Sequence, residues 1–111
     1  MDRVEDWRNE IKRILTESAS VRPAHGDIEV ELVFDDERAH YELVYTGWNG
    51  YRRVHGAVIH IDIKGDKVWI QHDGTEESVA DQLIAAGIPQ DRIVLAFHHP
   101  GKRQYTGFAV S

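Results

Sequence analysis

Seven histidines and nineteen acidic residues give this sequence many side chains that can bind a metal ion. Four of them lie close together in the chain: His60, Asp62, His72 and Asp73. Imidazole and carboxylate groups are the zinc ligands that remain in a protein without cysteine. The two histidines can share an ion only if they point to the same face of a sheet, so the strand pattern around them decides the question.

The residues from Val58 to Lys64 alternate strictly between apolar and polar side chains, which is typical of a half-buried β-strand. Gly65-Asp66 follows and predicts a two-residue hairpin turn. In that register Asp62 lies opposite Trp69 on a polar face, and the other face carries an aliphatic core. The aliphatic face consists of Ile59, Ile61, Ile63 and Ile70.

The same register separates the two histidines. His60 lies opposite Gln71, one residue before His72, so the side chains of His60 and His72 are expected on opposite faces. The adjacent pair His98-His99 diverges in the same way. The pattern therefore predicts no metal site and no cofactor.

A second chemical interpretation takes Asp62 and Lys64 as the D-x-K half of a metal-dependent nuclease site, with Asp35 or Asp27 as the other acid. Lys64 lies at a hairpin tip, however, where a charge has a simple role in solubility. No glycine-rich phosphate loop is present, and the serines lie in no nucleophile motif. The sequence therefore favours a protein that is not an enzyme.

The composition indicates an ordinary globular protein, expected to form one domain over residues 1–111. It has no cysteine and no apolar run of membrane-spanning length, so we expect a cytoplasmic protein that does not enter a membrane. The net charge of −6 repels DNA phosphates and disfavours a free-standing DNA binder. We interpret the basic pairs Arg52-Arg53 and Lys102-Arg103 as solvated loops.

Hydrophobic periodicity predicts an α+β fold. We expect an antiparallel β-meander of about four to six strands, with an N-terminal helix and a second helix packed on one face. The predicted elements are a helix at 3–18, strands at 27–35 and 40–47, a third strand ending at Lys64, a fourth beginning at Lys67, a helix beginning at Asp73 and ended by Gly87 and Pro89, a buried strand at 93–97, and a tail packed through Tyr105 and Phe108.

One register is inconsistent with this scheme. If Asn49-Gly50 forms a plain two-residue turn, Tyr41 and Tyr45 fall on the same face as His60. Either a β-bulge near Gly56 reverses the register, or both faces of the sheet are partly apolar. The second alternative leaves an aromatic face that another chain covers, either as a homodimer or as a different partner.

The mixed polar and aromatic face has the chemistry of a protein interface, where aromatic anchors lie among polar groups. The candidate interface residues are His60, Asp62, Trp69, Gln71, Tyr41 and Tyr45.

Several blocks in the same order resemble the XisI family, the fdxN element excision controlling factor proteins. The resemblance covers nearly the whole chain. It is carried by IKRILTE, IEVELVFD, YELVYTGW, VIHIDIKGDKVWIQHDGTE, GIPQDRIVLAF and RQYTGFAV.

The resemblance implies a small α+β protein that is needed, with a XisH-type partner, for excision of a DNA element by a site-specific recombinase in heterocyst-forming cyanobacteria. XisH-type proteins resemble restriction-endonuclease-like nucleases, which suggests that XisI-like chains bind and control one. We therefore expect a non-enzymatic accessory factor that acts through protein contacts and forms a homodimer, with direct DNA contact left open. The alternatives are an antitoxin-like inhibitor of a nuclease and a nuclease that uses Asp62 and Lys64.

Overall fold

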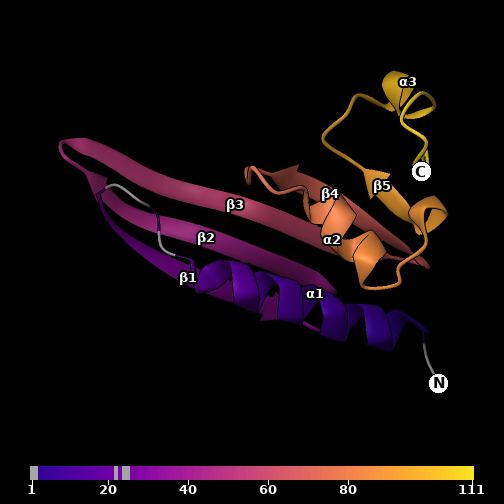
Figure 1. The fold of residues 1–111 in the computed structure, drawn as a ribbon, viewed down its shortest axis with the longest axis horizontal. Coiled ribbons are helices and arrows are strands. Elements are labelled where there is room, and N and C mark those ends of the chain that lie inside the picture. Colours follow the sequence, from indigo (N-terminus) through magenta and orange to yellow (C-terminus); the bar gives the residue numbers. More distant parts are fainter. Residues whose placement is uncertain (1–2, 22, 24–25) are drawn as a thin grey trace.

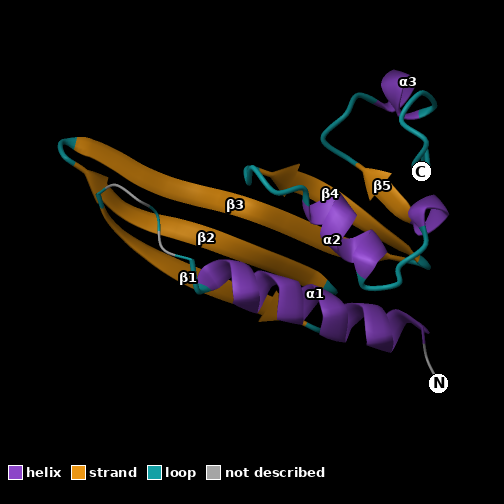
Figure 2. Ribbon diagram, in the orientation of Figure 1, coloured by secondary structure: helices purple, strands orange, loops and turns teal. Residues whose placement is uncertain are grey.

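A computed structural model describes residues 3–21, 23 and 26–111 (Figure 1). Its centre is a five-stranded sheet in the order β1-β2-β3-β4-β5, and the helices α1 and α2 lie on one face of it (Figure 2). The elements are α1 (Arg3–Ala19), β1 (Asp27–Asp35), β2 (His40–Asn49), β3 (Arg52–Lys64), β4 (Lys67–Asp73), α2 (Val79–Ala85), the 3-10 turn η1 (Gln90–Arg92), β5 (Ile93–Leu95) and α3 (Pro100–Arg103). The predicted α+β class is confirmed.

The amphipathic pattern of α1 explains its position. Its apolar residues recur three or four positions apart and form one stripe, which faces the sheet. Its outer side is held by ion pairs from Arg13 to Glu10 and Glu17, at N–O distances of 2.8 and 2.9 Å. The buried stripe consists of Trp7, Ile11, Ile14 and Leu15.

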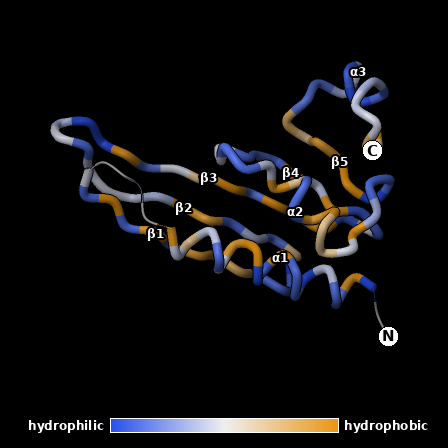
Figure 3. The backbone as a smooth tube through the Cα atoms, viewed as in Figure 1, coloured by the Kyte–Doolittle hydropathy of each residue, from blue (hydrophilic) through white to orange (hydrophobic). Residues whose placement is uncertain are grey.

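The core lies between the two helices and alternate residues of the central strands. Figure 3 shows the hydrophobic segments of β3, β4 and β5 gathered beside α2, whereas the loop joining β2 to β3 is hydrophilic. The predicted aliphatic face of the central hairpin is confirmed. The strand residues of the core are Tyr41, Leu43, Ile59, Ile61, Ile63, Val68, Ile70, Ile93 and Leu95.

A β-bulge between β2 and β3 resolves the inconsistent register. Leu43 pairs with Ile59 and Val44 pairs with Ala57, so Val58 has no partner opposite it. The bulge lies two residues from Gly56 and reverses the facing of β2 relative to β3. The hairpin loop itself is Gly50-Tyr51, one residue later than expected, because Asn49 and Arg52 pair with each other.

The bulge corrects the expected position of two tyrosines. Tyr41 pairs with Ile61 and is completely buried in the core. Tyr45 is half-buried and packs against the same core. Both therefore lie on the helix-covered face, not on the face of His60, and they are not part of an exposed interface with it.

A second register shift changes the pairing of β3 with β4. Asp62 pairs with Trp69 and Ile61 with Ile70, as predicted, but His60 pairs with His72. Gln71 is therefore the extra residue, and the expectation that it lies opposite His60 is wrong. The predicted placement of His60 and His72 on opposite faces rested on that register, and the observed pairing does not support it.

The second helix begins later than predicted, at Val79, because the preceding residues form a capped turn. The carboxylate of Asp73 accepts hydrogen bonds from the backbone N–H of Thr75 and of Val79, at 3.0 and 2.9 Å. Ser78 is the N-cap and accepts from the N–H of Asp81. Within the helix, Ile84 is 37% exposed and does not belong to the buried stripe that we expected it to join.

The fifth strand departs from a simple meander. β5 pairs with β4 in parallel, because α2 carries the chain across the sheet before the strand begins. The whole strand is buried, as the apolar run predicted, but Phe97 lies beyond it and is 48% exposed. In the tail, Phe108 packs against the core as expected, whereas Tyr105 is 82% exposed.

Among the described residues, no helix combines the length and apolar character needed to cross a membrane.

Candidate functional site

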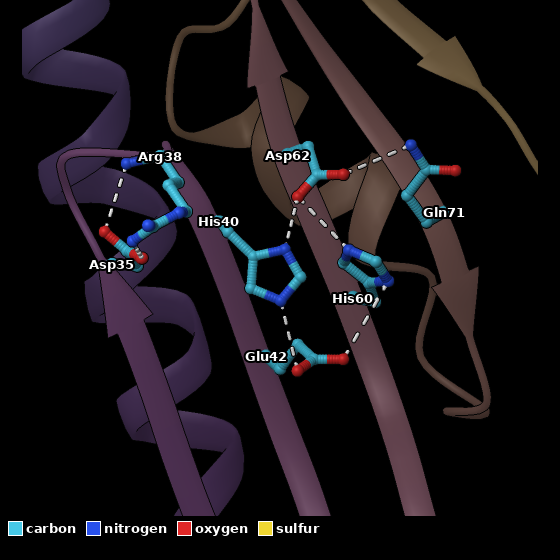
Figure 4. Close-up of polar contacts among 7 residues, drawn as sticks. All are labelled: Asp35, Arg38, His40, Glu42, His60, Asp62 and Gln71. Carbon is cyan, nitrogen blue, oxygen red and sulfur yellow. Dashed lines mark hydrogen bonds and ion pairs between the residues drawn. The ribbon is translucent and has the colours of Figure 1, made fainter.

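Four polar side chains form a compact cluster between β2 and β3, on the sheet face opposite α1 and α2 (Figure 4). We call this face the open face and the cluster the polar square. Its members are His40 and Glu42 from β2, and His60 and Asp62 from β3. Antiparallel pairing sets His40 opposite Asp62 and Glu42 opposite His60, so each histidine has a carboxylate both across the ladder and along its own strand.

Three of the four polar contacts within the square are 3.1 Å or shorter. Asp62 Oδ1 lies 2.8 Å from Nδ1 of His40 and 3.1 Å from Nε2 of His60. On the other side, Glu42 Oε2 lies 3.1 Å from Nε2 of His40, and Oε1 lies 3.9 Å from Nδ1 of His60. The two imidazole rings pack edge to face with centroids 4.4 Å apart. Both ring nitrogens of each histidine thus point at carboxylates.

The side chains of the polar square are partly shielded from solvent but are not fully buried. Side-chain exposure runs from 17% for Asp62 to 32% for His40. Partial burial of the His40 ring lowers its pKa, but the hydrogen bond to Glu42 and the charge of Asp62 outweigh this effect and raise the pKa of His40 above its ordinary value. The cluster therefore favours a positive charge on His40 between two carboxylates.

Neighbouring residues hold the square in place. Gln71 donates from Nε2 to Oδ2 of Asp62 at 3.3 Å. Asp35, which pairs with His40 across β1 and β2, is tied to Arg38 through both the backbone N–H and the guanidinium. These hydrogen bonds from Arg38 lower the pKa of Asp35.

Trp69 lies beside the square and is half-buried under two cations. Lys64 Nζ is 4.8 Å from the ring centroid, and the guanidinium carbon of Arg103 is 5.6 Å from it. Arg103 also donates to the backbone carbonyls of Ala96 and His98, both at 3.1 Å. Trp69 is thus a platform that attaches the C-terminal segment to the sheet.

The structure brings together some of the predicted site residues and not others. Asp62 contacts both His60 and Gln71, and Trp69 pairs with Asp62 across the ladder. Asp73 serves as a cap for α2. Lys64 packs on Trp69, whereas the oxygens of Asp62 accept hydrogen bonds from His40 and Gln71. The two side chains of the D-x-K pair therefore do not point to one shared position.

His40 and Glu42 were missed as site residues. Their signal was in the sequence: His40-Tyr41-Glu42 and His60-Ile61-Asp62 repeat one pattern, histidine, apolar residue, acid. When two such strands pair antiparallel, each histidine meets the other strand's acid. The bulge at Val58 is what brings the two copies into register.

Comparisons with known proteins agree with the fold. A model of the XisI protein family matches residues 1–110. A crystal structure of a XisI-like protein from Anabaena variabilis ATCC 29413 superposes with a TM-score of 0.87 at 40% identity, covering 95% of this chain and 96% of that one. No curated protein matches the chain.

A second crystal structure, of the fdxN element excision controlling factor XisI from the same organism, superposes with a TM-score of 0.86 at 32% identity. That alignment covers 99% of this chain and 100% of the other. A family model that spans almost every residue, together with two full-length structural matches, establishes the relationship: the chain belongs to the XisI family.

Proposed function

We propose that this protein is a non-enzymatic accessory factor that controls site-specific excision of a DNA element through protein contacts. The observation that carries the proposal is the full-length similarity to a protein described as the fdxN element excision controlling factor XisI. That similarity extends over 99% of this chain and 100% of the other, so it is not confined to one part of the fold.

The partner that we propose is a XisH-type, nuclease-like protein bound at the open face, centred on His60, Asp62, Trp69 and Gln71. The apolar faces of α1 and α2 are already packed on the other side of the sheet. On the open face the charges of the square are paired with one another, which lowers the cost of removing water from them when a partner binds. The part of Trp69 that Lys64 and Arg103 leave exposed supplies an aromatic contact of the kind that anchors interfaces.

Co-purification with the XisH-type protein tests the proposal. Gln71→Arg places a bulky charge on the open face and should abolish capture of the partner. Asn9→Arg makes the same change in charge at an exposed position of α1 and should leave capture intact. Circular dichroism and thermal melting must show that both variants are folded.

Two results would contradict the proposal. Failure of the unmodified chain to capture the partner would show that the two proteins do not bind each other. Equal capture by both variants would show that the open face is not the binding surface. A growth assay separates accessory control from antitoxin-like inhibition, because only the latter predicts that the partner alone arrests growth and that this chain relieves the arrest.

A further inference from the structure

We propose that His40, His60 and Asp62 form a binding site for a divalent transition-metal ion with zinc-like ligand preferences. One ligand atom from each residue lies within 4.8 Å of the other two. In tetrahedral zinc sites, with metal–ligand distances of about 2.1 Å, ligand atoms lie roughly 3.4 Å apart. The observed separations of 2.8 and 3.1 Å from Asp62 Oδ1 to the histidine nitrogens need to open by about 0.3–0.6 Å to admit an ion.

The residues that contact these three ligands are of the kind that orient the ligands in metal sites. A ligating histidine usually gives its second ring nitrogen to a carboxylate, which fixes the ring and its tautomer. Here Glu42 faces the distal nitrogens of both rings, at 3.1 Å from His40 Nε2 and 3.9 Å from His60 Nδ1. Gln71 holds the second oxygen of Asp62 at 3.3 Å. The three ligands are therefore oriented by neighbours that do not themselves need to bind the ion.

The ligand chemistry selects the class of ion. Two imidazoles and one carboxylate suit Zn²⁺, Ni²⁺ or Co²⁺, whereas Mg²⁺ and Ca²⁺ require a shell made almost entirely of oxygens. Three protein ligands leave one coordination position for water or for a donor from another molecule. The ligands are 17–32% exposed, so an ion reaches them from solvent without a change in fold. The site belongs to this chain alone and does not depend on the partner proposed above.

Isothermal titration calorimetry on the chelator-treated, dialysed chain tests the proposal with ZnCl₂, and with MgCl₂ as the contrasting ion. We expect one Zn²⁺ per chain and no heat from Mg²⁺. His40→Ala and Asp62→Asn should each weaken zinc binding at least about 100-fold, and Glu42→Gln should weaken it about 10- to 100-fold. His55→Ala, a change at an exposed histidine of β3 outside the square, should bind as the unmodified chain does.

A measurement on the unmodified chain covers the case in which a variant fails to fold. Long-range ¹H–¹⁵N spectra of the histidine rings should show Zn²⁺-dependent shifts at Nδ1 of His40 and Nε2 of His60. Absence of stoichiometric binding would overturn the proposal and leave the square as an ion-pair cluster only. Binding that persists in His40→Ala but is lost when His98 and His99 are replaced by alanine would overturn it as well.

Discussion

At the scale of single residues, Asp62 is the group on which the open face depends. Its two oxygens accept from His40, His60 and Gln71, and its side chain is only 17% exposed. Hydrogen bonds to charged groups contribute more than neutral ones when they are shielded from water. Loss of the carboxylate leaves two partly buried histidines without their shared acceptor.

We therefore expect Asp62→Asn to lower the free energy of unfolding by about 1–2 kcal/mol in urea titrations that contain a chelator. Glu31→Gln is the matched control, because Glu31 is exposed on β1; it should change stability by less than about 0.5 kcal/mol. Equal effects of the two changes would show that the square contributes no stability.

A second residue-scale prediction concerns acid stability at the β1–β2 turn. Asp36 accepts from Lys12 Nζ at 2.6 Å and from the buried Tyr41 hydroxyl at 2.9 Å, and these hydrogen bonds lower the pKa of Asp36. Because its pKa is lower in the folded state, Asp36 stabilises the fold above its unfolded pKa of about 3.9. That contribution is lost as the pH falls through the folded pKa.

The urea midpoint of the unmodified chain should therefore fall between pH 5 and pH 3 by more than the midpoint of Asp36→Asn does. Tyr41→Phe should reduce the pH dependence only partly, because Lys12 still pairs with Asp36 in that variant. If Asp36→Asn and the unmodified chain lose stability in parallel over this range, the turn does not contribute to acid sensitivity.

At the scale of elements, the two bulges explain which parts of the fold followed from the sequence. The helix α1, the strand β1 and the Gly65-Asp66 hairpin were predictable because each is fixed by local periodicity and turn chemistry. A bulge has no comparable local signature, since it depends on how two strands pair. The inconsistent facing of Tyr41 nevertheless left a bulge near Gly56 as one of two alternatives, the other being a sheet with two partly apolar faces.

The candidate site was only half predictable for the same reason. His60 and Asp62 stood out on a strictly alternating strand, but their partners on β2 depended on a register shifted by Val58. Likewise, the parallel pairing of β5 depends on the path of the chain through α2. Nothing in the apolar run from Ile93 specifies that direction.

The ends of β2 and β3 extend past α1 as a hairpin arm (Figure 1). In this arm, position 47 requires glycine. Its φ is 155°, and a Cβ there would lie 2.0 Å from the carbonyl oxygen of Asp27 and 2.8 Å from Cα of Ile28. Gly47→Ala therefore forces β1 away from β2 and should cost about 2–3 kcal/mol of stability.

Gly50→Ala is the control for that prediction. Gly50 also has a positive φ, of 63°, but a Cβ there has open space within 4 Å, so it should cost only the backbone strain of about 1 kcal/mol. Urea denaturation of both variants measures the difference. A Gly50 effect as large as that at Gly47 would mean that strain, not contact with β1, sets the requirement.

The C-terminal segment depends on Arg103. Its guanidinium donates to Ala96 and His98 and packs over Trp69. Hydrogen–deuterium exchange should show that Arg103→Ala increases exchange in residues 96–111 while the amides of β2 and β3 keep their protection. Lys102→Ala removes a neighbouring exposed cation and should leave the exchange pattern unchanged. Loss of protection across the whole sheet in Arg103→Ala would contradict a local role.

At the scale of the whole molecule, the net negative charge disfavours direct binding to DNA and so supports the proposed action through protein contacts. Nineteen acids oppose thirteen lysines and arginines, and the exposed basic pair Arg52-Arg53 lies at the tip of the hairpin arm, where Arg53 stacks on Trp48. Free-standing DNA binding requires several phosphates to be neutralised at once, and typical non-specific dissociation constants at physiological salt are about 10⁻⁴–10⁻⁶ M. An isolated pair of arginines in a net negative field falls short of this requirement.

Fluorescence anisotropy with a labelled duplex should therefore detect no binding by the unmodified chain up to about 100 μM at 150 mM salt. Reversing two exposed charges of β1, in the double variant Glu29→Lys and Glu31→Lys, should produce measurable, salt-sensitive binding and so prove that the assay responds to added positive charge. Micromolar binding by the unmodified chain that is lost in Arg52→Ala or Arg53→Ala would place a DNA contact at the arm. In that case the hairpin arm, and not the open face alone, would have to be included in any account of how a XisI-family protein reaches the element that is excised.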